Sequence, residues 1–452
     1  MKKITSMGPA SKLSRRHFLT GMLGTVACAG IPVPRSAASG YRYAVEKLRT
    51  AHIGVGGMGA ADLASIASHA GVEVAALCDV DRRMLEPAAA KFPLAHSFVD
   101  YRDMLSTMVD AIDAVVVSTP DHTHAPAVMW AMNHNKAVYC QKPLTHQVYE
   151  ARRLREVAEE RALITQMGIQ IHAAAVYRRA VEVIRSGAIG LIREVHAWSN
   201  KNWGFDGGTL PAETQPPREL NWDLWLGTAT HRQFVEGFYH PGSWRKLIDF
   251  GTGTLGDMGV HIFDTPYRAL RLTAPTSVKT NCRQPNGIGH PETVIVEYEF
   301  PATEFTTDAF RWIWYDGSNA PTSGEKFGLP DDLRLPDQAA LFIGEEGSLL
   351  LPHVSELQLF PADKFADYKP PQLEELNHYH QWIDACFGVG APSANFSYAG
   401  PLTEALLLGV VASRFPNVKL GWQSDEFAFV EFPEADQLLR SAYRSEFAVE
   451  NL

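Results

Sequence analysis

The sequence predicts an α/β fold in which a first domain with a parallel sheet is followed by an α+β domain with a large, mainly antiparallel sheet that is open on one face. Strand and helix patterns alternate from residue 51 to residue 170, which is typical of parallel βαβ units. From residue 171 onward, alternating and aromatic-rich strand patterns dominate. A chain of 452 residues is long enough for two substantial cores. We therefore expect two domains, 51–170 and 171–452.

The first turn between a strand and a helix carries a glycine motif. It follows the predicted strand end Ala51–Ile53 and precedes a helical pattern over Ala60–Ile66. In a Rossmann fold, the first glycine of such a motif allows a tight turn. The second lets the main chain approach a pyrophosphate, and the third lets the helix pack on the strand. The motif therefore predicts a dinucleotide site formed by Gly54, Gly56, Gly57, Met58 and Gly59.

The second strand adds a carboxylate to this site. Val72–Cys78 is apolar and ends in Asp79, about 20 residues beyond the glycines. A carboxylate there accepts a hydrogen bond from a ribose 2′-hydroxyl and repels a 2′-phosphate, so we predict NAD as the cofactor. Arg82 and Arg83 follow closely and leave NADP open, because a guanidinium can bind a phosphate.

Two more apolar strands, Ala111–Ser118 and Ala137–Cys140, continue the parallel sheet. Ligands of such sheets bind at the carboxyl ends of the strands. We therefore expect contacts with the cofactor from Ser118, Thr119, Pro120, His122 and His124. Two histidines without nearby cysteines or carboxylates make a poor zinc site. We predict no metal, and we assign the two histidines to the nicotinamide ribose or to helix capping.

Three side chains are candidates for catalysis. Lys142 precedes Pro143, which constrains the peptide, permits a cis form and can hold the lysine rigidly at the mouth of the sheet. Asp257 and His261 are spaced i,i+4, which places both on one helical face. Hydride loss from a carbinol carbon requires a base for the hydroxyl proton, and imidazole titrates near neutrality. A lysine beside an oxidised nicotinamide is shifted toward its neutral form, so Lys142 can also accept that proton.

These motifs together resemble those of the glucose-fructose oxidoreductase and inositol dehydrogenase family, written Gfo/Idh/MocA. That family carries a nucleotide glycine motif, a Thr-Pro segment, a Glu-Lys-Pro segment and a later Asp-x-x-x-His. The resemblance runs from about His52 to Phe415 and includes a Gly-x-Ile-x-Glu-Val segment at 190–195 and a Gly-x-x-Gly-Ser-Leu segment at 344–349. Gln141 replaces the usual Glu, which keeps an amide for hydrogen bonding but removes a charge near the nicotinamide.

The resemblance implies roles for several residues. Lys142 and His261 would transfer protons, and Asp257 would orient the substrate. Gln141, Lys142 and Gln170 would contact the cofactor, and Tyr177 and Arg178 the substrate. Aromatic faces suit sugar C–H surfaces, so we add Trp203, from the loop Asn200–Asn221, as a substrate contact. For each tryptophan around this loop, packing in the core or in a dimer is an equally good interpretation: Trp198, Trp203, Trp222, Trp225 and Trp244.

The first 38 residues form a predicted twin-arginine signal peptide. Arg15 and Arg16 precede Phe18, a weakly apolar run over Thr20–Ile31 and a small-residue cleavage site before Ser39. We expect export of the folded protein to the periplasm by the twin-arginine machinery, with residues 39–50 forming an N-terminal arm. Lipoprotein anchoring through Cys28 is an alternative in a poor sequence context.

The composition narrows the function. Asp and Glu total 51 against 41 Lys and Arg, and no basic tract follows the signal, so we expect no nucleic-acid partner. The favoured hypothesis is an oxidoreductase with tightly bound NAD that acts on a sugar, glycoside or cyclitol hydroxyl. One alternative is a glycosidase that works through transient oxidation at C3 and elimination; another is a non-catalytic nucleotide-binding sensor or scaffold. We also expect a homo-oligomer, a dimer or tetramer, formed through the open sheet face.

Overall fold

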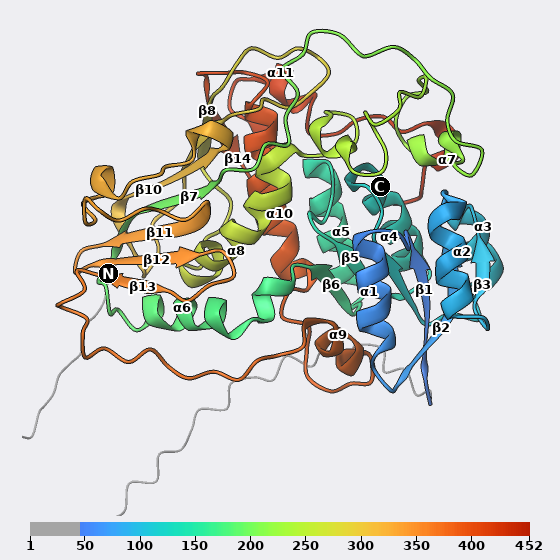
Figure 1. The fold of residues 1–452 in the computed structure, drawn as a ribbon, viewed down its shortest axis with the longest axis horizontal. Helices are drawn as coiled ribbons and strands as arrows, with labels where there is room; N and C mark the ends of the chain where they lie inside the picture. The colour runs from blue at the N-terminus through green and yellow to red at the C-terminus, as the bar shows by residue number, and fades with distance from the viewer. Residues whose placement is uncertain (1–45) are drawn as a thin grey trace, which may run out of the picture. The chain divides into compact units, whose positions relative to one another are not determined.

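A computed structural model describes residues 46–452, and its first domain is built on a six-stranded parallel sheet (Figure 1). The strand order is β3-β2-β1-β4-β5-β6, so the order reverses between β1 and β4, where ligands of doubly wound sheets bind. The predicted signal peptide and most of the predicted arm lie outside the described residues. The strands are β1 (Leu48–Ile53), β2 (Val72–Cys78), β3 (His96–Phe98), β4 (Ala114–Val117), β5 (Ala137–Gln141) and β6 (Thr165–Gly168).

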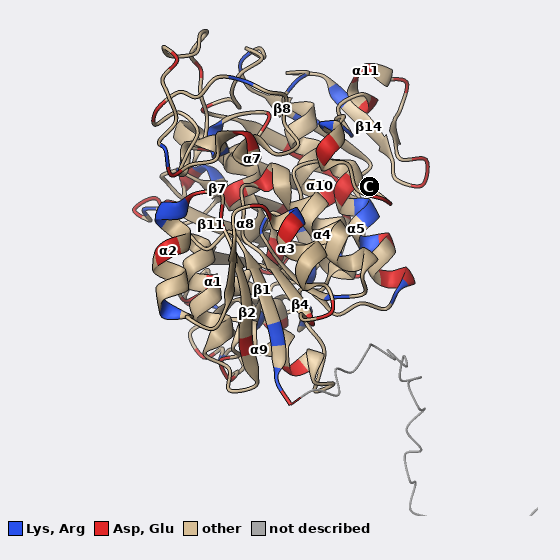
Figure 2. Ribbon diagram, turned by 90° about the vertical axis from the view of Figure 1, so that its right-hand side faces the viewer, with Lys and Arg blue, Asp and Glu red and all other residues tan. Residues whose placement is uncertain are grey.

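The predicted alternation of strands and helices is present throughout this domain. β4 is buried along its whole length, as a strand covered by helices on both faces must be. Figure 2 shows the strands of this sheet mostly in tan and the charged residues mainly on the surrounding helices. β1 begins at Leu48, three residues before the expected domain boundary, so residues 48–50 belong to the sheet. The helices are α1 (Met58–Ala67), α2 (Arg82–Lys91), α3 (Tyr101–Met108), η1 (Asp121–Thr123), α4 (His124–Asn133) and α5 (Val148–Glu160).

The second domain contains a nine-stranded sheet with the order β13-β12-β11-β7-β10-β9-β8-β14-β15. β7 and β10 run parallel, and the other neighbours are antiparallel, so the prediction of a mainly antiparallel sheet is confirmed. The segment at 344–349 forms the tight β11–β12 hairpin. The strands are β7 (Ile192–Ser199), β8 (Ser277–Asn281), β9 (Ile295–Glu299), β10 (Thr306–Asp316), β11 (Gln338–Gly344), β12 (Ser348–Pro352), β13 (Gln358–Phe360), β14 (Lys419–Gln423) and β15 (Ala428–Phe429).

Helices and short turns connect and cover this sheet. α8 and α10 lie between the two sheets in Figure 1 and contribute to one continuous apolar core. Within residues 46–452, no helix combines the length and apolar character needed to cross a bilayer. The helical elements are η2 (Gln170–Ala173), α6 (Ala175–Arg185), α7 (Trp222–Leu226), η3 (Ser243–Lys246), the π-helical η4 (Leu255–Gly259), α8 (Val260–Ala269), η5 (Gly317–Asn319), η6 (Glu325–Phe327), α9 (His378–Cys386), α10 (Phe396–Ala412), α11 (Pro433–Asp436) and η7 (Ser445–Phe447).

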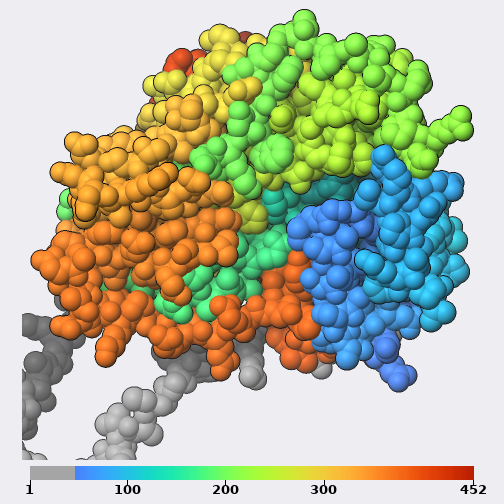
Figure 3. Space-filling model, in the orientation of Figure 1, coloured from blue at the N-terminus to red at the C-terminus, as the bar shows by residue number. Residues whose placement is uncertain are grey.

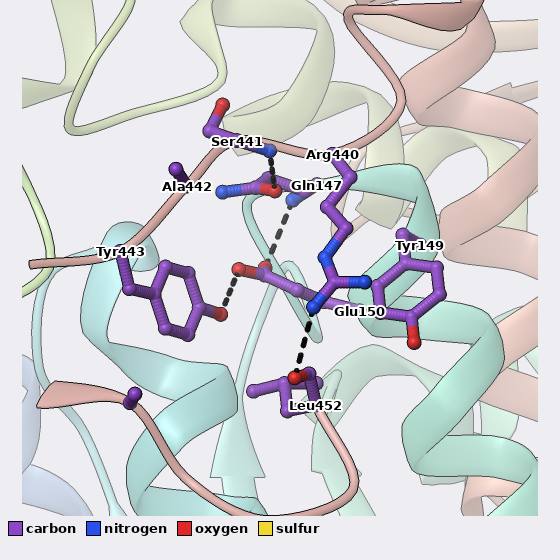
Figure 4. Close-up of a pocket in the computed structure, with 9 residues that line it drawn as sticks. Gln147, Tyr149, Glu150, Arg440, Ser441, Ala442, Tyr443 and Leu452 are labelled. Carbon is purple, nitrogen blue, oxygen red and sulfur yellow. Dashed lines mark hydrogen bonds between the residues drawn. The ribbon is translucent and has the colours of Figure 1, made fainter. Parts of the chain in front are cut away.

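The last part of the chain returns to the first domain. Trp382 and Ile383 of α9 are fully buried in the core that includes Leu63 and Ile66 of α1. The segment after α11 packs on the start of α5, where Tyr443 donates a hydrogen bond to the buried Glu150 (Figure 4). A cavity of about 130 Å³ remains beside this contact. Residues 378–452 therefore stabilise both domains.

Four of the five tryptophans near the loop Asn200–Asn221 are core residues. Trp198 is fully buried in the nine-stranded sheet, where its indole donates a hydrogen bond to the Pro336 carbonyl. Trp222, Trp225 and Trp244 are buried in a separate aromatic cluster beneath the loop. The packing interpretation is therefore correct for these four, and Trp203, which is only partly buried, is left as a candidate substrate contact.

Candidate active site

The glycine turn has an open side where a pyrophosphate can approach. Gly54 has φ +80°, and a Cβ there would lie 2.6 Å from the Ser118 carbonyl oxygen. A Cβ on Gly59 would lie 2.1 Å from the Gly54 oxygen, which enforces close packing of α1 on β1. Gly57, with φ +53° and no atom within 4 Å of a Cβ, faces open space beside Gly56. A Cβ on Gly56 would collide with the Met84 side chain.

α1 begins directly at this open side. Gly57 is its N-cap, and no side chain accepts a hydrogen bond from the first turn of the helix. The first amides of a helix carry a partial positive charge and can bind phosphate oxygens. The turn therefore fits the pyrophosphate of a dinucleotide, with Met58 exposed at its rim.

Asp79 is fixed at the carboxyl end of β2. Its Oδ2 accepts a hydrogen bond from Val55 N–H and its Oδ1 one from Asp81 N–H, both at 2.9 Å. Arg83, which could have received a 2′-phosphate, instead binds the fully buried Asp81 through two nitrogens. Of the two arginines that left NADP open, Arg82 remains exposed. The two main-chain amides hold the Asp79 carboxylate in place at the end of β2.

The structure brings Lys142 and Asp257 together. Lys142, which follows β5 and precedes a cis peptide to Pro143, donates from Nζ to Asp257 Oδ1 at 2.7 Å. Arg245, from η3, donates from Nε to the same oxygen at 3.2 Å. Burial opposes ionisation of Asp257, but the charges of Lys142 and Arg245 outweigh it and hold the pKa of this carboxyl well below its ordinary value. Asp257 is therefore an ionised acceptor. Arg245 also lies 5.6 Å from the centre of the Trp203 ring, which places that indole beside the pair.

His261 lies in the first turn of α8, directly after the π-helical turn that carries Asp257. The two side chains form no hydrogen bond with each other, and His261 Nδ1 is buried without a partner. Burial, strengthened by the charge of Lys142, lowers the pKa of His261 well below its ordinary value. The imidazole is therefore neutral near pH 7 and can accept a proton.

His353 is part of the site, and the sequence did not indicate it. It follows β12, and its ring centre lies 5.7 Å from that of His261. Tyr177 bonds to its Nδ1 at 2.6 Å and also accepts a hydrogen bond from Val354 N–H at 2.8 Å. Tyr177 thereby connects His353 to the main chain at Val354, and its contact with substrate stays a prediction. A histidine after an apolar strand gives no signal of this pairing.

Three further predicted residues have protein partners in the structure. His122 is 2% exposed, and its Nε2 faces the carbonyls of Trp225 and Leu226. Both nitrogens of His124 lie at hydrogen-bond distance from carbonyls, those of Thr119 and Pro143. Both histidines therefore meet main-chain carbonyls, and those beside His122 are the last two of α7. Arg178 donates to the main-chain oxygen of Glu374 on the surface.

The remaining predicted cofactor residues surround a carboxylate that the sequence did not reveal. Asp62 of α1 is 0% exposed and accepts hydrogen bonds from Ser118 Oγ (2.7 Å), Gln141 Nε2 (2.9 Å) and Tyr379 OH (2.9 Å). Gln170 extends this network by donating to the Tyr379 hydroxyl. The amide that replaces the usual Glu at 141 is thus the donor that a buried carboxylate needs.

The ion pairs of Asp257 are partly open to solvent. Figure 3 shows a hollow where the blue surface of the first domain meets the green and orange surfaces of the second. The side chains of Lys142, Asp257 and Arg245 are 15%, 11% and 27% exposed, so solvent reaches the ion pairs.

Two family models match the chain. The oxidoreductase family's NAD-binding Rossmann fold matches residues 48–169, and its C-terminal alpha/beta domain matches residues 177–300. The chain belongs to the Gfo/Idh/MocA oxidoreductase family. The resemblance found in the sequence is therefore confirmed, and the glycine turn and Asp79 lie in the part of this Gfo/Idh/MocA protein that matches an NAD-binding domain. The shape of the turn and the carboxylate at the end of β2 both fit NAD.

Curated relatives match over a third of the chain or less. Inositol 2-dehydrogenase of Salmonella typhimurium is 28% identical over 152 residues, which are 33% of the chain and 45% of that enzyme. D-xylose 1-dehydrogenase [NADP(+)] of Haloarcula marismortui is 32% identical over 125 residues, 27% of the chain and 35% of that enzyme. The matches span less than half the length of these relatives.

Solved structures share the fold of both domains. WlbA dehydrogenase from Bordetella pertussis, in complex with NADH and UDP-GlcNAcA, aligns with TM-score 0.59 and 16% identity over 83% of this chain and 99% of that one. Aldose-aldose oxidoreductase from Caulobacter crescentus, complexed with glycerol, aligns with TM-score 0.56 and 15% identity over 83% and 100%. At identities this low, the structural alignments show that the fold is shared.

Proposed function

We propose that this protein transfers hydride between a hydroxyl-bearing carbon of a sugar, glycoside or cyclitol and a tightly bound NAD. The observation that carries the proposal is the ion pair of Lys142 and Asp257 at the carboxyl edge of the parallel sheet, with the neutral His261 beside it. This edge is also where the glycine turn and Asp79 lie. The names of the relatives, inositol and xylose dehydrogenases, support a polyhydroxylated substrate.

Asp257, Lys142 and His261 have different roles in this reaction. When bound, NAD supplies the hydride acceptor. Asp257 stays ionised and accepts a hydrogen bond from a substrate hydroxyl, while Lys142 Nζ donates to the reacting oxygen. Because Lys142 is paired with Asp257, its role is that of a cation that stabilises developing charge on that oxygen. His261 is neutral and takes the hydroxyl proton as hydride leaves the carbon.

We further propose that the protein works in the periplasm after twin-arginine export. Free nicotinamide cofactor is not expected there, so the nucleotide must be acquired in the cytoplasm and retained. A retained cofactor must be reoxidised in each cycle, either by the carbonyl of a second sugar or by return of the hydride to the first one.

The proposal is tested on protein as purified. Mass spectrometry of freshly denatured protein should identify one nucleotide per chain, and addition of a reactive sugar should produce the absorbance of reduced nicotinamide. If a broad panel of sugars, uronates, glycosides and cyclitols gives no reduction of bound NAD, the proposal is wrong.

A further inference from the structure

A lysine cation stands beside the proton-transfer residues without a carboxylate partner. Lys201 lies two residues after β7, and its Nζ contacts the thioether sulfur of Met258 at 3.2 Å. Thioether sulfur is a weak acceptor. No carboxylate of residues 46–452 forms an ion pair with Lys201, whereas Lys142 and Arg245 share Asp257. Met258 adjoins Asp257 in the chain, so the unpaired ammonium lies next to the site.

His353 lies beside His261, with 5.7 Å between the ring centres. The Tyr177 oxygen accepts a hydrogen bond from Val354 N–H, and the Tyr177 hydroxyl can donate its own hydrogen to His353 Nδ1. A neutral imidazole whose Nδ1 accepts carries its proton on Nε2. Burial, together with the charges of Lys201 and Lys142, lowers the pKa of His353 to about 4, so the ring is neutral near pH 7.

The local charges leave a positive surplus. Of the three cations, Lys142 and Arg245 interact with the buried carboxylates Asp257 and Asp121, and Lys201 interacts with neither. Asp257 forms ion pairs with both Lys142 and Arg245. Asp121 is buried, accepts a hydrogen bond from Thr252 at 2.8 Å, and has its pKa raised to about 6 by burial. The charge of Lys201 is therefore not compensated by these groups.

We propose that Lys201 and His353 form an anion-binding subsite beside His261, and that the substrate sugar carries an anionic group, a carboxylate or a phosphate. This inference rests on the proposed function. An ammonium and an imidazole N–H both donate hydrogen bonds, which matches the acceptor-only chemistry of an anionic oxygen. An anion held there keeps a hydroxyl of the same sugar close to Lys142 and His261.

The experiment compares anionic and neutral sugars on nucleotide-loaded protein. Glucuronate, glucose 6-phosphate and glucose are each mixed with the protein, and kcat/KM for reduction of bound nucleotide is measured. The unmutated protein should prefer one anionic sugar, and whether that is the uronate or the phosphate identifies the group. In Lys201→Met the ratio of anionic to neutral kcat/KM should fall by about 10- to 100-fold, the usual range for one charge-assisted hydrogen bond.

Two companion variants sharpen the result. His353→Phe keeps the ring but removes the N–H, and should lower the same ratio by about 5-fold, as expected for a hydrogen bond worth about 1 kcal/mol. Lys91→Met removes an exposed lysine at the end of α2 and is the matched control. The subsite is wrong, and the proposed function stands, if the kcat/KM for glucose equals that for both anionic sugars. The same conclusion follows if Lys201→Met leaves the ratio at its original value. If no sugar reduces the nucleotide, the proposed function fails first.

Discussion

Replacing Gln141 by Glu should place two carboxylates against each other in the interior. Gln141 Nε2 now lies 2.9 Å from Asp62 Oδ2, and both residues are buried. Two unit charges at this distance repel by about 6 kcal/mol at an effective dielectric constant of about 20. The protein can escape part of this cost by protonating one carboxyl. For a carboxyl with an ordinary pKa of about 4.3, that costs about 4 kcal/mol at pH 7. Protonating one carboxyl costs less than keeping both charged, so Gln141→Glu should be destabilised by up to about 4 kcal/mol at pH 7.

The destabilisation should depend on pH in a defined direction. The folded pKa of the new pair is raised above the unfolded value, so stability is lost as pH rises. Relative to the original protein, the loss should shrink by about 1.4 kcal/mol for each pH unit between about 7 and 5. Thermal unfolding at the two pH values measures this: the gap in Tm between Gln141→Glu and the original protein should narrow at the lower pH.

A charge exchange supplies the control. In the double variant Asp62→Asn with Gln141→Glu, the carboxylate and the amide change places, and one donor again faces one acceptor. The double variant should regain at least half of the lost stability. A Tm gap that does not change with pH, or a double variant no more stable than Gln141→Glu, would refute the assignment of the Gln141 amide as the donor to Asp62.

Three further predictions follow from the cofactor site, the N-terminus and the chemistry. Asp79→Ser should relax the preference for NAD toward NADP, and extraction of mainly NADP from the unmutated protein would contradict the assignment. Replacing Arg15 and Arg16 by lysine should leave active, nucleotide-loaded protein in the cytoplasm, as cell fractionation would show; normal periplasmic yield would mean that the signal is misread. Lys142→Ala and His261→Ala should each slow reduction of bound nucleotide by about 10²–10⁴-fold while the nucleotide is retained; near-normal rates would point to another base.

The elements that the sequence predicted well are those encoded locally. The glycine turn, the apolar strand β2 and the carboxylate at its end are written in consecutive residues, because turn geometry and burial act on neighbours in the chain. The predicted strand Ala137–Cys140 likewise appears as β5 (Ala137–Gln141). Lys142 and Asp257 were chosen through motif and resemblance, and the structure shows that they meet.

The parts that the sequence did not reveal depend on contacts between distant segments. Asp62 and Tyr379 are 317 residues apart and meet only because α9 returns to α1. Tyr177 and His353 are 176 residues apart, and neither stands in a spacing that suggests a pair. Arg245 shares Asp257 with Lys142 through a short 3₁₀ turn in a loop-rich region, where periodicity carries no information.

The central claim is that hydride passes directly between a sugar carbon and the nucleotide held by this protein. Nucleotide-loaded protein should be mixed with a reactive sugar that carries deuterium on every carbon. The protein should be denatured within one turnover, and the mass of the released nucleotide should be measured by mass spectrometry. The account predicts reduced nucleotide that contains one deuterium. Reduced nucleotide without deuterium, or oxidised nucleotide alone after exposure to every sugar in the panel, would contradict it.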